Sequence, residues 1–312
     1  MARGRPTRVW RTSENWRASS FSRWAARTVS DAGLAQLMQL ARLRRLALDR
    51  TQVTDAGLAR LTQLAGLTDL WLQNTKVTDA GMLQLAKLPD LRNISVSGTA
   101  VTDVGVAHLV DLTDLQVLSL DNTQVTDATL VRLEHLAELR GIDLSHTGVT
   151  DAGLAHLEGL TRLMQLSLEF TPVTDAGLEH IKGLTDMQIL YLRGSHVTDA
   201  GLKALEGMTK LRVLGLEDTV VGDAGMPHLS GLASLEHLLL FNTQVTDAGL
   251  SHVSGLTCLV RLWLSRTQVS DAGLANLMGL KSLFNLTLDG TRVTEAGIVN
   301  LKRVLPTLHV LQ

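Results

Sequence analysis

An aspartate recurs at one fixed interval through most of the chain, and this repetition constrains the fold more than any other feature. Successive copies are 24 residues apart, with no insertion or deletion between them. The series runs through Asp31, Asp55, Asp79, Asp103, Asp127, Asp151, Asp175, Asp199, Asp223, Asp247, Asp271 and Glu295. A constant spacing requires every unit to stack on its neighbour in the same way, so we predict a solenoid of about 12 repeats.

Each unit carries one strand pattern and one helix pattern. In residues 67–77, LTDLWLQNTKV, two leucines flank Trp71, an alternation typical of a strand whose leucines point inward. The following TDAGMLQLAKL spaces its apolar residues by three, as the buried stripe of a short helix requires. The threonine at its start is suited to cap the helix, with the aspartate at the positive end of the helix dipole. We therefore predict an α/β fold with one strand and one short helix per unit.

Three further columns have structural interpretations. Thr51 and its equivalents are expected to satisfy the turn after each strand and to form a hydroxyl ladder between units. Gly57 and its equivalents are expected where helix and neighbouring turn crowd together, although Thr129 replaces glycine in one unit. A last set of glycines is expected to form left-handed helix C-caps. These are Gly159, Gly183, Gly207, Gly231, Gly255 and Gly279.

The run L-x-x-L-x-L-x-x-T-x-V followed by T-D-A-G-L resembles the leucine-rich repeat family. The resemblance covers residues 29–312 and ends in a shortened C-terminal unit. Most members of the family carry Asn or Cys where this chain has Thr, or Ser195 in one unit. The T-D-A-G-L helix start is most similar to the cysteine-containing subclass of F-box adaptors and to bacterial relatives. The resemblance implies a horseshoe with a parallel β-sheet on the concave face and short helices on the convex face.

Residues 1–28 differ from the repeats, because they contain seven arginines against the single acid Glu14, interleaved with aromatic residues. One interpretation is an N-terminal cap or extension, in which these side chains cover the leucines of an open solenoid end. The other is a basic arm that binds nucleic acid, with the aromatic rings stacking on bases. We favour the cap or extension, since the rest of the chain, at a net charge of −2, supplies no basic stripe.

The sequence contains no pattern that indicates catalysis or a cofactor. It lacks a glycine-rich phosphate loop, a G-x-S-x-G elbow and an H-E-x-x-H helix. Five histidines share one helical position, where a metal site competes with an exposed convex column; other residue types at that position favour the column. They are His108, His156, His180, His228 and His252. We expect no enzyme activity, no catalytic residue, no metal and no cofactor.

The chain is expected to be soluble and cytoplasmic. No apolar run approaches the ~20 residues of a membrane span, and the N-terminus lacks the apolar core of a signal peptide. The single cysteine, Cys258, excludes an internal disulfide framework and has no patterned partner for nucleophilic chemistry.

The concave face is where the units differ. The residue between the last two leucines of each strand pattern is small or polar in most units, but not at Tyr191, Leu239 and Trp263. With Phe241, these residues are predicted to form one apolar patch across strands ~4.8 Å apart. Gly215 is expected to leave a shallow notch beside Tyr191. The alternative is that the aromatic rings merely pack against one another on a broad face.

Charges at the concave positions are acidic on balance. Seven acids, Asp49, Asp69, Asp121, Asp143, Glu169, Glu217 and Asp289, oppose Arg45, Arg193 and Arg261. This balance favours a protein or peptide partner with basic character around an apolar anchor, and it argues against nucleic acid. Arg193, Glu217 and Arg261 are expected to orient the partner at the rim of the patch, and Trp71 is a secondary candidate.

Together these features predict a non-enzymatic scaffold that binds a protein or peptide on its concave face. The alternative is a substrate-recognition adaptor or effector that acts with a ubiquitin-ligase-like machinery. Only the likeness to F-box-type repeats suggests this alternative, and residues 1–28 are too short for that helical domain.

Overall fold

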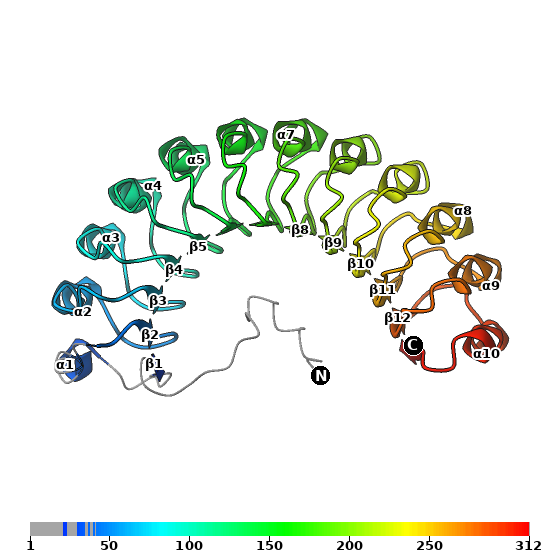
Figure 1. Cartoon of the computed structure of the whole chain (residues 1–312), viewed down its shortest axis with the longest axis horizontal. Coiled ribbons are helices and arrows are strands. Elements are labelled where there is room, and N and C mark those ends of the chain that lie inside the picture. The colour runs from blue at the N-terminus through cyan, green and yellow to red at the C-terminus, as the bar shows by residue number, and fades with distance from the viewer. Residues whose placement is uncertain (1–20, 24–29, 35–36, 38–39, 41, 312) are drawn as a thin grey trace.

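The computed structural model describes residues 21–23, 30–34, 37, 40 and 42–311, which form one curved solenoid (Figure 1). Strands line the concave side and helices line the convex side. In this part of the chain thirteen strands form one sheet in chain order, β1 to β13, and every neighbouring pair is parallel. The predicted α/β horseshoe is therefore confirmed.

The strands are all three residues long. They are β1 Phe21–Arg23, β2 Arg45–Ala47, β3 Asp69–Trp71, β4 Asn93–Ser95, β5 Val117–Ser119, β6 Gly141–Asp143, β7 Gln165–Ser167, β8 Ile189–Tyr191, β9 Val213–Gly215, β10 His237–Leu239, β11 Arg261–Trp263, β12 Asn285–Thr287 and β13 His309–Leu311.

The convex side consists of short α-helices and 3₁₀ helices. The α-helices are α1 Asp31–Leu34, α2 Asp55–Leu61, α3 Asp79–Leu85, α4 Asp103–Val106, α5 Asp127–Leu133, α6 Asp151–Leu154, α7 Asp175–Ile181, α8 Asp247–Leu250, α9 Asp271–Leu274 and α10 Glu295–Val304. The 3₁₀ helices are η2 Ala107–Leu109, η3 Ala155–Leu157, η4 Gly201–Leu205, η5 Met226–Leu229, η6 Ser251–Val253 and η7 Ala275–Leu277.

The 24-residue interval is also the register of the sheet. Leu190 pairs with Leu214, and the last strand keeps this offset because His309 pairs with Asn285. At the other end, β1 comes from the arginine-rich segment and places Phe21 opposite Arg45. Most of residues 1–28 lie outside the described residues, and so do the two interpretations of that segment.

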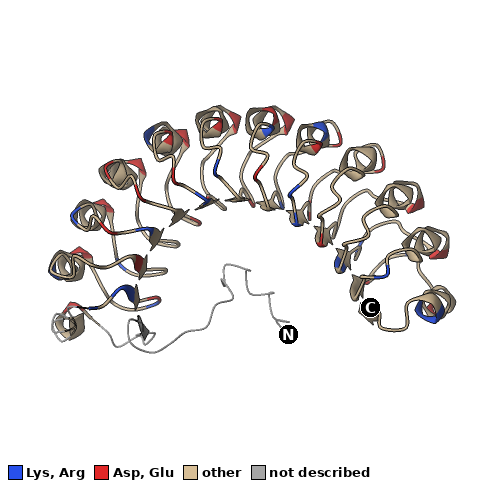
Figure 2. Cartoon of the chain, in the orientation of Figure 1, with Lys and Arg blue, Asp and Glu red and all other residues tan. Residues whose placement is uncertain are grey.

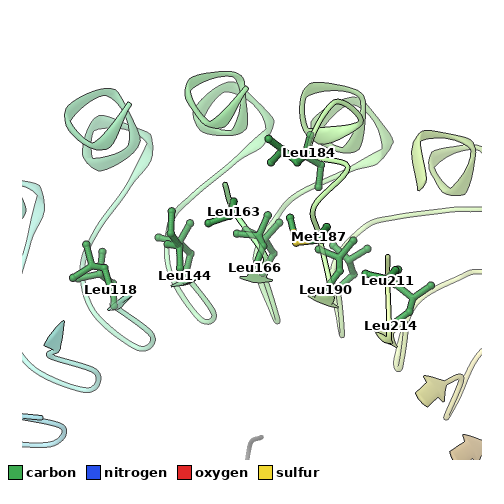
Figure 3. Close-up of a cluster of buried hydrophobic side chains, with 14 of the residues drawn as sticks. Leu118, Leu144, Leu163, Leu166, Leu184, Met187, Leu190, Leu211 and Leu214 are labelled. Carbon is green, nitrogen blue, oxygen red and sulfur yellow. The ribbon is translucent and has the colours of Figure 1, made fainter. Parts of the chain in front are cut away.

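The leucines of the repeat form one core between the sheet and the helices. Leu118, Leu144, Leu166, Leu190 and Leu214 come from five successive units and are all fully buried (Figure 3). Aliphatic side chains of nearly the same size can stack in this way along the whole arch, which explains the inward-pointing leucines expected from the sequence.

The aspartate column joins each unit to the next. Oδ1 of Asp151 accepts a hydrogen bond from the Thr174 backbone N–H at 2.7 Å, and Oδ2 accepts one from its hydroxyl at 2.6 Å. The Thr174 hydroxyl in turn accepts the N–H of Ala176 and caps α7, so the predicted N-cap is confirmed. We name this arrangement the Asp–Thr joint. It recurs at Asp31–Thr54, Asp55–Thr78, Asp79–Thr102, Asp103–Thr126, Asp127–Thr150, Asp175–Thr198, Asp223–Thr246, Asp247–Ser270 and Asp271–Thr294.

The joint also explains the glycine column and its exception. A Cβ at Gly177 would overlap Oδ1 of Asp151, so any side chain there must displace that oxygen. Thr129 is fully buried at the equivalent position, and its hydroxyl donates to Oδ1 of Asp103 at 2.6 Å. Burial raises the pKa of Asp103, but the hydrogen bonds from Thr129 and Thr126 outweigh it and hold that pKa below its usual value.

We expect Thr129→Val to destabilise the protein by about 2 kcal/mol, because the isosteric side chain keeps the bulk and removes a hydrogen bond to a charged group. Urea unfolding would measure this loss. The matched control is Thr129→Gly, which removes the same hydroxyl but leaves no apolar bulk against Oδ1 of Asp103, as in most other units. It should cost at most about 1 kcal/mol of helix propensity. Equal unfolding midpoints for Thr129→Val and the unmodified protein would contradict this account of the joint.

Two expectations about local geometry are wrong. Thr75 donates to the carbonyl of Leu72, three residues earlier in its own unit, and the equivalent residues do the same. The hydroxyls therefore satisfy the turn, as expected, but they do not form a ladder between units. The six glycines after the helices have no left-handed φ, because each helix ends in a tight turn with negative φ. In one such turn the backbone N–H of Thr161 donates to the carbonyl of Gly159.

Left-handed backbone occurs instead just after the strands. The residues are Arg50, Asn74, Gly98, Asn122, His146, Phe170, Gly194, Asp218, Asn242, Arg266 and Gly290. Asparagine and glycine tolerate this conformation, whereas a bulky phenylalanine adopts it only when other contacts hold it there.

Candidate functional site

The predicted apolar row lies on adjacent strands of the concave side. In the sheet register Tyr191 pairs with Gly215, Gly215 with Leu239, and Leu239 with Trp263. The row therefore crosses β8, β9, β10 and β11 without a break. Phe241 follows β10 and faces the same side as Leu239, since side chains two residues apart share a face.

Exposure differs along this row. Tyr191, Phe241 and Trp263 are half-buried, so each keeps part of its ring in contact with solvent. Leu239 is only 8% exposed, which corrects its place in the expected exposed patch. Its neighbours in the register are Gly215 and Trp263, and beside the larger indole a leucine is short enough to be covered.

The notch expected at Gly215 is filled. A Cβ on Gly215 would lie 2.8 Å from Oε2 of Glu217 and 2.8 Å from Cδ1 of Tyr191. The space left by the missing side chain is therefore taken by the Glu217 carboxyl group and the Tyr191 ring.

The sequence predicted that Glu217 lies at the rim of the patch. This prediction is wrong, because the side chain is buried within the patch. The residue is 6% exposed, and its Oε2 is the one buried side-chain polar atom without a hydrogen-bond partner in the described part of the chain. Burial raises the pKa of Glu217 to about 7, and the charges of Glu169 and Asp218 act in the same direction. A hydrogen bond from its own backbone and the charge of Arg193 oppose the shift without cancelling it.

Arg193 is engaged by groups other than Glu217. Its Nε and Nη2 atoms donate to Oδ2 of Asp218 at 2.8 and 2.7 Å. Its guanidinium carbon lies 5.2 Å from the ring centroid of Phe170. Phe170 is 42% exposed in its left-handed conformation and stacks on His146 at 4.6 Å between ring centroids. Arg193 thus belongs to a polar and aromatic cluster in the turns that follow the strands.

The sequence reasoning missed Phe170 and His237. The signal for Phe170 was an aromatic residue in a turn column otherwise occupied by small, polar or charged residues. His237 pairs with Arg261 in the register, next to the apolar row. Burial lowers the pKa of His237, and the charge of Arg261 lowers it further. Arg261 itself is exposed, as its expected rim position requires.

The remaining candidate, Trp71, lies on β3 and is not brought together with the row. Its register neighbours are Ala47 and Ser95. Trp71 is half-buried. It therefore provides an aromatic side chain in the same column of the concave face but at a separate place, which makes it a useful control.

The acidic balance of the concave face needs one correction. Asp69, Asp143 and Glu217 are buried, so they add little to the surface charge. Asp69 accepts hydrogen bonds from Thr68 and Asn93. The partly exposed acids are Asp49, Asp121, Glu169 and Asp289. Along the arch, acidic and basic residues alternate instead of gathering at one end (Figure 2).

Three of the five convex histidines pair with glutamates of the preceding unit. Nδ1 of His156 lies 2.8 Å from Glu134, and His180 and His228 make the same contact with Glu158 and Glu206. This partner stands 22 residues earlier, in a column that the histidine spacing alone does not reveal. No group of three or more His, Cys, Asp or Glu residues that could hold a metal ion is found in the described ranges. Cys258 is exposed.

None of the helices in the described ranges has both the length and the apolar character needed to span a bilayer.

Comparison with known proteins agrees with this architecture. A family model described as a leucine-rich repeat matches residues 183–205. An internalin (inlF) from Listeria monocytogenes superposes with a TM-score of 0.69 at 21% identity, over 88% of this chain and 82% of the internalin. The chain has the leucine-rich repeat fold.

Two other solved structures have the same leucine-rich repeat fold. Internalin C2 (inlC2) from Listeria monocytogenes is 27% identical over 74% of this chain and 92% of its own, with a TM-score of 0.55. The ectodomain of the Arabidopsis thaliana membrane receptor kinase GASSHO1/SCHENGEN3, solved in complex with CASPARIAN STRIP INTEGRITY FACTOR 2, is 18% identical, with a TM-score of 0.56. That match covers 89% of this chain and 36% of the ectodomain. No significant match to a curated protein was found. The likeness to F-box-type repeats is untested by these matches and stays a prediction.

Proposed function

We propose that this leucine-rich repeat protein is a non-enzymatic scaffold that binds a protein or peptide on its concave face. The proposed site is the patch of Tyr191, Leu239, Phe241 and Trp263, named here the β8–β11 patch. The observation that carries the proposal is the set of half-buried aromatic rings on neighbouring strands, on a face whose other units carry mainly small or polar residues. Aromatic residues of this kind dominate the binding energy of protein interfaces.

Two further observations support a protein or peptide partner. The plant ectodomain with the same fold was solved in complex with CASPARIAN STRIP INTEGRITY FACTOR 2. The partly exposed acids of the concave face, among them Glu169 and Asp289, favour a partner with basic character. Arg261 is exposed beside the patch and is proposed to orient that partner, whereas Arg193 is already engaged with Asp218.

Site-specific photo-cross-linking would identify the partner and test the face at the same time. A photo-reactive amino acid at Arg261 should cross-link the partner, whereas the same group at Ser119, on β5 of the same face, should cross-link it far less. Equal yields from both positions would argue against the β8–β11 patch.

With the purified partner, we expect Tyr191→Ala and Trp263→Ala each to weaken binding by about 2 kcal/mol or more, because each removes a large desolvated contact. Titration calorimetry would measure the affinity, and circular dichroism would verify the fold. The matched control is Trp71→Ala, which deletes an aromatic ring from the same column at β3, and Ser119→Ala is a second control. Full affinity in both patch variants, or a loss only in Trp71→Ala, would refute the assigned site.

A further inference from the structure

Glu217 is placed where a partner on the β8–β11 patch would meet it. The residue follows β9, and its carboxyl group folds back over Gly215, the only residue of the row without a side chain. The ring of Tyr191, from the neighbouring strand β8, borders the same space. The carboxyl group therefore lies over Gly215 and beside the Tyr191 ring of the patch.

The nearest charges leave this carboxyl group without a cation of its own. Arg193 donates hydrogen bonds from Nε and Nη2 to Asp218 and faces Phe170. Glu169 and Asp218 add negative charge near Glu217, so three carboxyl groups surround one arginine. This local excess of negative charge attracts a cationic group and repels an anionic one.

The orphaned oxygen makes the site specific for a donor. A buried polar atom without a hydrogen-bond partner destabilises the structure, and a carboxylate more than a neutral group. Oε2 of Glu217 is such an atom among the described residues. A partner that donates a charged hydrogen bond to Oε2 would remove this penalty, so its own binding would be strengthened by the same amount.

From this arrangement we infer that Glu217 receives the ammonium group of one lysine side chain of the partner, beside Tyr191 of the β8–β11 patch. The inference rests on the proposed function and adds the chemistry of one contact to it. Only one carboxyl oxygen is buried without a partner, which suits the point donor of an ammonium group. A guanidinium group prefers two coplanar oxygens, and the Tyr191 ring beside the carboxyl group further favours a cation.

Access requires a side-chain rotation, since Oε2 is covered in the free protein. Tyr191 is the obvious candidate, because its ring borders the space over Gly215 and is itself half-buried. Rotamer changes of this kind are common when proteins bind their partners.

Tyr191 is the only tyrosine of the chain, which provides a spectroscopic probe at the site. Full-length protein labelled with 3-fluorotyrosine should give one ¹⁹F resonance. At pH 8 and constant ionic strength, n-butylammonium chloride should shift this resonance saturably, and n-butylguanidinium chloride should bind more weakly. In Glu217→Gln the n-butylammonium affinity should fall roughly tenfold or more, as expected for the loss of a charge-assisted hydrogen bond.

The control variant is Glu169→Gln, which removes a nearby acid of the same face but leaves the carboxyl group over Gly215. It should retain the n-butylammonium shift within a few-fold. The affinity of the unmodified protein should rise from pH 6 to pH 8, because the proton that Glu217 holds below about pH 7 competes with the ammonium group. Glu217→Gln should show no such rise.

Three results would overturn the inference: no saturable shift with n-butylammonium, an equal shift in Glu217→Gln, or tighter binding of n-butylguanidinium. These outcomes are separate from those that test the scaffold function, because the fragment titration needs no partner. If Trp263→Ala abolished partner binding while Glu217→Gln left both partner and fragment binding unchanged, the scaffold function would stand and the lysine contact would be refuted.

Discussion

Removing residues 103–126, one complete unit of 24 residues, should leave a folded and shorter solenoid, whereas removing residues 103–114 should unfold the chain. In the longer deletion Thr102 is followed directly by Asp127. Thr102 keeps its hydrogen bonds to Asp79, and Asp127 keeps those to Thr150. Every Asp–Thr joint between the remaining units is thus kept, and the strands remain in register.

The shorter deletion breaks the same features. It removes α4 and Asp103, so Thr126 loses both hydrogen bonds of its joint. The remaining half unit cannot span from the convex to the concave side, and β5 cannot keep its offset from β4. In a solenoid each unit is stabilised mainly by its neighbours, so this interruption exposes core leucines on both sides.

Far-ultraviolet circular dichroism and urea unfolding would distinguish the two deletions. The shorter solenoid should keep the ellipticity per residue and a cooperative transition, and the half-unit deletion should lose both. A further control is the removal of residues 115–138, another stretch of 24 residues cut at a different point, which should behave like the first. If all three deletions unfolded alike, the fixed 24-residue register would not be what holds the fold.

A second large effect is expected from Glu217→Gln, which should stabilise the folded protein by about 3 kcal/mol at pH 8. The pKa of Glu217 rises from 4.5 to about 7 on folding, mainly through burial, and each pKa unit corresponds to about 1.4 kcal/mol. Below pH 4.5 the group is protonated in both states and carries no such penalty. Between pH 4.5 and 7 the unfolded chain releases the proton while the folded protein retains it, so stability falls as pH rises.

Urea unfolding at pH 4, 5.5, 7 and 8 would follow this change. The two proteins should differ little at pH 4, and the gap should widen up to about pH 7 and then remain constant. The control Glu179→Gln removes an exposed convex carboxylate that pairs with Lys182, and it should not reproduce the gap. A difference of the same size at pH 4 and pH 8 would show that Glu217 is not desolvated as described.

The fold could be predicted from the sequence because each unit depends on short-range patterns repeated at one interval. Leucine alternation indicated the strands, and the spacing of three indicated the helices. The same interval fixed the register, so Tyr191, Leu239 and Trp263 could be placed within four successive strands from the sequence alone. The hydrogen bonds of the Asp–Thr joint were not predicted, because the two residues stand 23 positions apart and a single unit shows only a helix start.

Details of the candidate site could not be predicted, since they depend on which side chain fills a given space. The periodicity assigned Glu217 to the concave face but could not show that it folds over Gly215. It likewise could not show that Arg193 turns to Asp218 or that Leu239 is covered. The exposed turn position of Phe170 was not predicted, because left-handed turn positions were expected after the helices. They follow the strands instead.

The Asp–Thr joint has a consequence for how such a gene can change. Nearly every unit presents the same acceptor to the unit that follows and the same donor to the unit that precedes it. The exception is Gly222, which lacks the hydroxyl and binds Asp199 through its backbone N–H. The joint therefore hardly distinguishes one pair of units from another. Unequal recombination between any two repeats of the coding DNA would therefore add or remove whole units whose new neighbours already match. Copy number becomes a heritable trait that selection can adjust one strand at a time, and each duplicated strand brings three new concave positions free to diverge.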